Sequence, residues 1–322
     1  MTRYFIYQKP QVYHLSWRGT LNKGRTGLLT FNSAVPSGNI NNDLVRVSFL
    51  LPPCGGPAVI VTHGLYEQTH SYARYLWKKL GALGFTTFFL QLPYHMDRTP
   101  AGKLSGQVFI TTDAEHSVSA FRQAIVDISS LIDILEREPT FSAAVKQGIG
   151  AMGISLGAII LNTAFAVEHR IKTAVSILGA GNLGGVVAES PMTLPLVIAG
   201  IVKGLNPYHC RQAVKDYRGF LNLVKEKGVE NVEPAWPWFL VDPLTYARAG
   251  YFRREDFLML NGSFDLIIPR HYTREFWRAA GKPEIVWLPC SHFTSPLLSR
   301  RITSLTAGFL RRHLKTSALS TS

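Results

Sequence analysis

Short apolar runs of the kind that form buried strands alternate with helical segments along most of this chain. Eight such runs occur, at 13–19, 44–52, 57–64, 86–93, 148–152, 173–179, 256–262 and 284–289. Helical patterns fill many of the gaps between them, at 71–84, 112–135, 157–169, 270–281 and 295–314. This alternation predicts an α/β fold, with a mostly parallel eight-stranded sheet covered by helices on both faces.

The length and composition indicate a globular protein with one large domain, or one domain with an insertion. The chain has 322 residues, of which 46% are hydrophobic and 17% charged, and this composition argues against a disordered protein. The alternation stops between residues 181 and 250, where no clear strand is found. We therefore predict a core made of residues 1–180 and 251–322, and a helical cap, residues 181–250, inserted over the carboxyl edge of the sheet.

Cysteine content, targeting signals and charge limit the possible surroundings and partners. The three cysteines, Cys54, Cys210 and Cys290, are few and far apart, which favours a reducing, cytoplasmic compartment over a disulfide framework or a zinc site. The first residues lack the pattern of a signal peptide, and no apolar run is long enough to span a bilayer. The formal net charge of +13 is scattered, apart from a mild excess near Arg300, Arg301, Arg311, Arg312 and Lys315. We therefore expect no nucleic-acid partner, while attraction to anionic lipid or acidic substrates stays open. The oligomeric state is not predicted.

The stretch IGAMGISLGAIIL, residues 149–161, carries the most specific signal. It places one hydroxyl, Ser155, between Gly153 and Gly157 where a buried strand meets an apolar helix. A serine at so sharp a turn takes a strained backbone conformation, and the two glycines relieve the crowding. The turn also directs backbone N–H groups at the start of the helix toward a developing oxyanion. The alternative is a serine–glycine kink that only helps helices to pack.

Four motifs occur in order at the ends of predicted strands: VIVTHGL, GISLG, NGSFDLIIP and LPCSHF. Through them, residues 45–313 resemble the α/β-hydrolase superfamily, in particular its compact bacterial esterases and dienelactone-hydrolase-like proteins. The resemblance implies a catalytic triad in the order nucleophile, acid, histidine. Matched residue by residue, it makes Ser155 the nucleophile, Asp265 the acid and His292 the base.

The resemblance also implies an oxyanion hole, made by the backbone N–H groups of Leu65 and Leu156. We expect His63 and Gly64 to shape the loop that holds Leu65 rather than to act in catalysis. The acid has a rival in Asp242, because some relatives carry the acid after an earlier strand.

Two glycine motifs and one possible pair of metal ligands could indicate other kinds of site, but each gives a weaker signal than the serine motif. GIGAMG (148–153) and GAGNLG (179–184) match the glycine pattern of dinucleotide sites, but the first lies within a strand and no acid-tipped strand follows the second. His95 and Asp97 form only a single pair of possible metal ligands, so we predict neither a metal nor a cofactor. Arg98 beside them could instead bind an anionic group of the substrate.

Together these features predict a serine hydrolase that cleaves a carboxylic ester through an acyl-enzyme intermediate, as carboxylesterases and lipases do. Acyl transferases, thioesterases and peptidases use the same triad, and the fold does not choose among them. A catalytically inactive ligand-binding protein on the same scaffold is the alternative of another class. The expected partner is a small-molecule ester, and the sequence does not specify its acyl and alcohol parts.

One apolar stretch of the cap, MTLPLVIAGIVKGL (192–205), is too apolar to lie exposed on a soluble protein. It is too short to span a membrane. It either packs into the core, forms a lid that roofs the acyl pocket above Ser155, or makes an interfacial or dimer contact. In the lid interpretation, Trp236 and Trp238 lie nearby.

Overall fold

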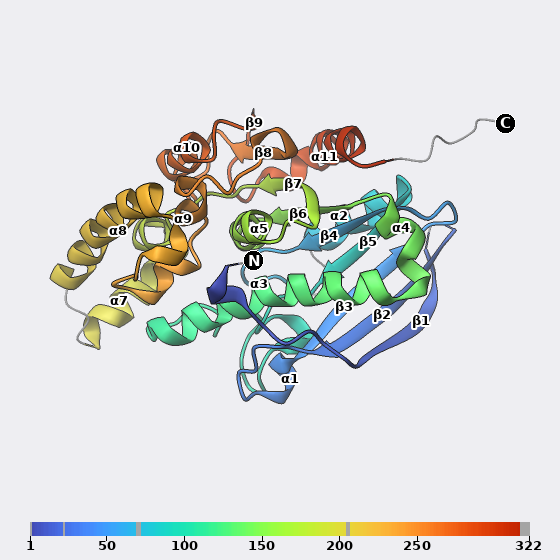
Figure 1. Ribbon diagram of the computed structural model, residues 1–322, viewed down its shortest axis with the longest axis horizontal. Helices are drawn as coiled ribbons and strands as arrows, with labels where there is room; N and C mark the ends of the chain where they lie inside the picture. Colours follow the sequence, from blue (N-terminus) through green and yellow to red (C-terminus); the bar gives the residue numbers. More distant parts are fainter. Residues whose placement is uncertain (1, 22, 69–71, 204–206, 316–322) are drawn as a thin grey trace.

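A single sheet forms the centre of the protein, whose computed structural model describes residues 2–21, 23–68, 72–203 and 207–315. Within these residues the sheet has nine strands in the order β1-β2-β3-β5-β4-β6-β7-β8-β9 (Figure 1). The strands are β1 Tyr13–Leu21, β2 Gly24–Asn32, β3 Leu44–Leu51, β4 Gly56–Thr62, β5 Phe85–Leu90, β6 Ile149–Ile154, β7 Ile171–Ile177, β8 Phe257–Gly262 and β9 Glu284–Leu288.

The predicted mostly parallel sheet is confirmed, with one strand more than the eight expected. The neighbours β5-β4-β6-β7-β8-β9 run parallel, whereas β1–β2, β2–β3 and β3–β5 are antiparallel pairs. The strand missed in the sequence is β2, in which Gly24 and Gly27 occupy two buried positions and give no hydrophobic signal. A Cβ on Gly27 would lie 2.2 Å from the ring of Phe49, so the ring fills the space that a side chain would need.

Helices cover both faces of the sheet, and each face has its own hydrophobic core. Along β4, Ala58 and Ile60 face one core while Val59 and Val61 face the other, as the alternation of a strand requires. The second core includes α2 Tyr72–Ala82 and α11 Ser299–His313. The first includes α3 Ala114–Arg137, α4 Ser142–Lys146, α5 Leu156–Val167 and α10 Arg270–Ala279. A short helix, α1 Ile40–Asp43, precedes β3.

Helices make up the long connection between β7 and β8, and its described residues contain no strand. They are α6 Leu183–Glu189, α7 Leu194–Val202, α8 Pro207–Lys227 and α9 Pro243–Arg248. Figure 1 shows them gathered at one end of the sheet, away from β1 and β2. Helix α9 packs against α5 and α10, and α8 packs on α9. That residues 181–250 act as a separate cap stays a prediction.

None of the described helices is by itself long and apolar enough to cross a bilayer, although α6 and α7, bent at 88° to each other, pass the length and composition test as a pair.

Candidate active site

Ser155 lies at the turn from β6 to α5, in a backbone conformation that L-residues rarely adopt. Its φ is 54° and its ψ −119°, and such strain costs on the order of 1–3 kcal/mol. The flanking glycines are needed because the backbone is crowded here. A Cβ on Gly153 would lie 2.4 Å from the carbonyl oxygen of Gly157, and a Cβ on Gly157 would lie 2.5 Å from that of His63.

Two more of the predicted residues, on the loops that follow β8 and β9, form a chain of hydrogen bonds that ends at Ser155. Nε2 of His292 lies 2.9 Å from Oγ of Ser155, and Nδ1 of His292 lies 2.8 Å from Oδ2 of Asp265. The other carboxylate oxygen of Asp265 accepts the backbone N–H groups of Ile267 and Ile268 at 2.9 and 3.0 Å. These bonds hold the acid in place, and the acid holds the imidazole with Nε2 directed at the serine hydroxyl.

Asp242, the rival acid, does not bond to His292 and instead holds together parts of the helical connection between β7 and β8. It is buried, and its carboxylate accepts the backbone N–H groups of Asn182 at 2.9 Å, Leu244 at 2.8 Å and Leu183. These bonds join the start of α6 to the start of α9. Burial raises the pKa of Asp242 from 3.8 to about 6, although the N–H groups oppose the shift. The structure therefore brings Asp265, and not Asp242, to His292.

The two predicted oxyanion donors border one cavity with the serine. Leu65, Ser155 and Leu156 all line this cavity. A Cβ on Gly64 would lie 3.6 Å from Cβ of Ser155, so the loop after β4 runs close beside the hydroxyl. Leu156 is the first residue of α5, and an N–H at that position has no partner within its own helix.

The side chain of His63 holds the loop after β4 in place through two hydrogen bonds. The backbone N–H of Leu92 donates to its Nε2 at 3.0 Å, so Nδ1 carries the proton and donates to the carbonyl oxygen of Gly64 at 2.9 Å. Burial, and after it the nearby His95, lowers the pKa of His63 well below its usual value, so the ring is neutral. The ring thus ties the peptide before Leu65 to the end of β5, in agreement with the loop-shaping role expected for it.

An apolar chamber opens from Ser155 toward the helices between β7 and β8. It consists of a cavity of about 50 Å³ beside the serine and a second of about 190 Å³ beyond it. The two share the lining residues Ile110, Phe121, Leu183 and Val187. Leu196, Trp238 and Val241 line the outer part. Of the two tryptophans expected near the pocket, Trp236 does not line the chamber but donates from Nε1 to Asp216 at 3.1 Å.

Helix α7 contains most of the apolar stretch predicted as lid or core. Only Gly200 of this helix is buried, so the core interpretation is wrong. Leu196 lines the chamber, whereas Leu194 and Ile198 are 51% and 52% exposed. The final two residues of the stretch, 204 and 205, lie outside the described part of the chain.

Arg98 does not bind substrate, and that expectation is wrong. It is fully buried, pairs with Asp127 at 2.9 Å, and donates to the carbonyl oxygens of Asn42 and Gln91. Its neighbours His95 and Asp97 likewise bond within the loop, to the carbonyl of Pro93 and the side chain of Gln91. Within the described ranges, no three His, Cys, Asp or Glu residues are grouped as metal ligands would be.

The sheet order, the strained serine turn and the loops around it define the α/β-hydrolase fold, and solved structures confirm it. An acetyl xylan esterase from Thermoanaerobacterium sp. superposes with a TM-score of 0.59 at 18% identity, covering 92% of this chain and 89% of its own. An esterase from Pyrococcus furiosus superposes with a TM-score of 0.52 at 15% sequence identity, covering 94% of this chain and 93% of its own. An acylaminoacyl peptidase from Pyrococcus horikoshii superposes with a TM-score of 0.58 at 15% sequence identity, covering 95% of this chain and 42% of its own.

In sequence, the chain is similar to two uncharacterized proteins of Mycobacterium tuberculosis, from strains CDC 1551 and H37Rv. Each is 28% identical over 217 residues, which make up 67% of this chain and 44% of the relative. The match thus spans less than half the length of these curated relatives. No family model matches the chain.

Proposed function

We propose that this protein is a serine hydrolase that cleaves carboxylic esters through an acyl-enzyme intermediate. The observation that carries the proposal is the run of hydrogen bonds from Asp265 through His292 to Ser155, at a strained turn beside two backbone N–H donors. A structural serine needs neither the strain nor a histidine oriented by a buried carboxylate. A nucleophile needs both, because its hydroxyl must be exposed to the substrate and lose its proton.

In the proposed reaction, Oγ of Ser155 attacks the acyl carbon while Nε2 of His292 takes the hydroxyl proton. Asp265 keeps the proton of Nδ1 in place and stabilises the imidazolium that forms. The N–H groups of Leu65 and Leu156 bind the oxyanion, and His292 then returns the proton to the leaving alcohol. Water, activated by the same histidine, releases the acid from Ser155. These steps require no metal or cofactor.

The chamber supports an apolar acyl group as the part of the substrate held next to Ser155. Most of its lining side chains are aliphatic or aromatic, so an acyl chain would bind by burial at about 0.8 kcal/mol per methylene. Longer chains would extend past Leu183 to Leu196 and Trp238. The acylaminoacyl peptidase among the structural neighbours has the same fold, so the fold alone does not separate ester from amide substrates.

A fluorophosphonate probe tests the proposal, because it reacts only with a serine that has been activated as a nucleophile. We expect stoichiometric labelling, with the modified peptide containing Ser155, and no labelling of Ser155→Ala. A folded protein that the probe leaves unmodified is a ligand-binding protein on this scaffold. A panel of p-nitrophenyl esters of increasing chain length then separates acyl preferences, with the matching p-nitroanilides as the amide comparison.

A further inference from the structure

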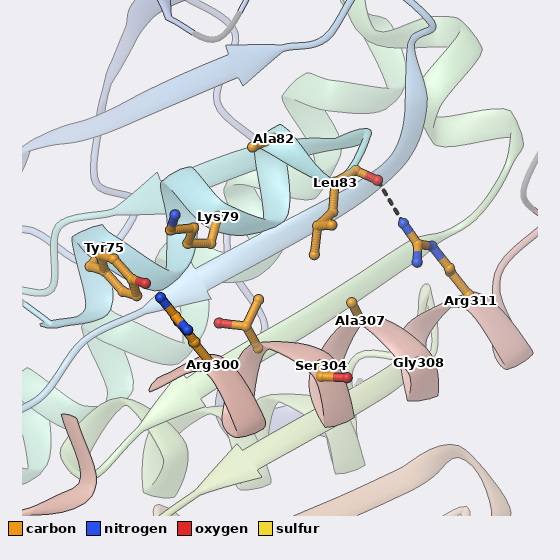
Figure 2. Close-up of a pocket in the computed structure, with 10 residues that line it drawn as sticks. Tyr75, Lys79, Ala82, Leu83, Arg300, Ser304, Ala307, Gly308 and Arg311 are labelled. Atoms are coloured by element: carbon orange, nitrogen blue, oxygen red, sulfur yellow. Dashed lines mark hydrogen bonds between the residues drawn. The ribbon is translucent and has the colours of Figure 1, made fainter. Parts of the chain in front are cut away.

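A groove of about 550 Å³ runs between α2 and α11, on the face of the sheet opposite α3 and α5. It is lined by Tyr75, Lys79, Ala82, Leu83, Arg300, Thr303, Ser304, Ala307, Gly308 and Arg311. Figure 2 shows Tyr75, Lys79 and Arg300 close together at one end. At the other end Arg311 donates to the carbonyl oxygen of Leu83 at 2.8 Å. The floor between the two ends consists of small side chains.

The two helices that form the groove carry seven cationic side chains and no acidic one. The cations are Arg74, Lys78, Lys79, Arg300, Arg301, Arg311 and Arg312. Arg312 pairs with Glu284 at 3.0 Å, but no described carboxylate lies within ion-pair distance of Lys79 or Arg300. Of these cations, Lys79, Arg300 and Arg311 line the groove, and cationic side chains without acidic neighbours attract anions.

The position of Arg300 and Arg301 is unfavourable for the helix that carries them. Both lie in the first turn of α11, where the partial positive charge of the helix end opposes a cation, and no acid occurs in this turn. A local cost of this kind indicates that the two guanidinium groups serve something outside the helix.

Exposed apolar side chains accompany the cations. Tyr75 and Leu83 of the groove are 38% and 42% exposed, and Leu297, just before α11, is 83% exposed. Phe293 in the same loop is 70% exposed. Cations beside exposed aromatic and aliphatic side chains match a boundary between charged headgroups and acyl chains. The helices present no reading element for a nucleic-acid groove and no row of aromatic platforms for stacked bases.

We propose that the α2–α11 face binds the surface of a membrane that contains anionic phospholipid, with a headgroup phosphate between Lys79 and Arg300. The hydroxyl of Tyr75 lies at the same end of the groove and can donate to a phosphate oxygen. Leu297 and Phe293 enter the headgroup layer. Phe293 adjoins His292, so docking brings the loop of the candidate active site toward the lipid. The binding itself does not depend on the proposed ester hydrolysis.

The test is co-sedimentation with vesicles of phosphatidylcholine, with or without phosphatidylglycerol, across a range of salt concentrations. The variant is Lys79→Glu/Arg300→Glu. Its matched control is Lys103→Glu/Lys227→Glu, which lowers the net charge equally at exposed positions elsewhere. If the first variant does not fold, Lys79→Gln/Arg300→Gln replaces it, with the corresponding Gln control. Duplex DNA and inorganic phosphate serve as competing ligands.

We expect wild type to bind only the vesicles with phosphatidylglycerol, and to bind them less well as salt rises. Each cation near an anionic surface contributes a factor of about five to binding, so the groove variant should bind about 30-fold or more weakly. The control should stay within about twofold of wild type. Equal losses in both variants, equal binding to both vesicle types, tighter binding to DNA than to vesicles, or binding of inorganic phosphate alone would each overturn the proposal.

Discussion

One carboxylate, Asp265, determines how the His292 ring is held, and so whether the ring can take a proton from Ser155. An amide at position 265 can donate to Nδ1 and so favours the tautomer that has its proton on Nε2, directed at the serine. We expect Asp265→Asn to lower kcat by about 10³ to 10⁴, as measured with p-nitrophenyl acetate. Asp242→Asn should cost far less, because Asp242 bonds to backbone N–H groups at the starts of α6 and α9 and to Tyr217, and not to His292. The opposite order would make Asp242 the acid.

At the scale of single residues, motifs at strand ends were enough to find the groups that meet at the site. Ser155, Asp265 and His292 each follow a predicted strand, and the parallel strands bring their carboxyl ends to one edge. The structural use of Arg98 could not be predicted. Its partners lie on α3 and before β3, and a sequence pattern does not reveal which distant carboxylate a buried guanidinium meets.

Among the elements, the link between α6 and α9 depends on the ionisation of Asp242. Its pKa is raised from 3.8 to about 6 in the folded protein, so the unfolded chain loses this proton first as the pH rises. The contribution of Asp242 to stability is therefore complete below about pH 4 and lost by about pH 6 to 7. The change is on the order of 3 kcal/mol.

The free energy of unfolding in urea, measured for wild type and Asp242→Asn from pH 4 to 7, tests this expectation. Taking the difference between the two proteins cancels the titration of all other groups. Wild type should lose stability relative to the variant as the pH rises. A difference that does not vary with pH would show that the carboxylate has its usual pKa in the folded protein.

Helix α7 offers a matched pair of substitutions that test whether residues 181–250 act as a cap that affects substrate choice. Leu196 lines the chamber, whereas Ile198, half a turn along the same helix, is 52% exposed. Leu196→Asp should raise KM for long-chain p-nitrophenyl esters about tenfold or more and leave kcat for the acetate within about tenfold. Ile198→Asp should change neither. If both variants behave alike at every chain length, α7 does not border the acyl site.

Most elements could be predicted because their apolar residues follow the period of a strand or a helix. Strand β2 was missed because buried glycines replace part of its apolar alternation. The place of helix α7 stayed open between core, lid and interface for a different reason. Its residues are apolar all round, so the sequence could not show which side faces the chamber and which side is exposed.

Across the whole molecule, the buried pair of Arg98 and Asp127 connects parts of the chain that are far apart in sequence. Asp127 on α3 also accepts the hydroxyl of Ser33 at 2.6 Å, and Arg98 reaches the carbonyl oxygen of Asn42. We expect Asp127→Ala to lower the free energy of unfolding by about 3–5 kcal/mol, because it leaves a buried charge without its partner. The free energy of unfolding can be measured by urea denaturation of wild type, Asp127→Ala and, as the comparison, the double variant Arg98→Met/Asp127→Leu. The double variant should recover part of the loss, and a greater loss would contradict the explanation.

The folded molecule gathers cationic side chains that the sequence keeps apart. Along the sequence most cations are scattered, but folding brings α2 and α11 side by side although they lie far apart in the chain. A reading of charge along the chain cannot detect a face assembled in this way. The sequence therefore showed the excess of cations on α11, but not that the cations of α2 lie beside them.

The most direct test of the central proposal is the rate of ester hydrolysis by folded Ser155→Ala. This change removes one oxygen atom and leaves Gly153, Gly157 and the oxyanion loop in place. We predict that kcat for p-nitrophenyl acetate falls by about 10⁴ or more, while the circular dichroism spectrum and the melting temperature stay close to those of wild type. A folded Ser155→Ala variant that hydrolyses the ester at a rate comparable to wild type would contradict the mechanism proposed for Asp265, His292 and Ser155.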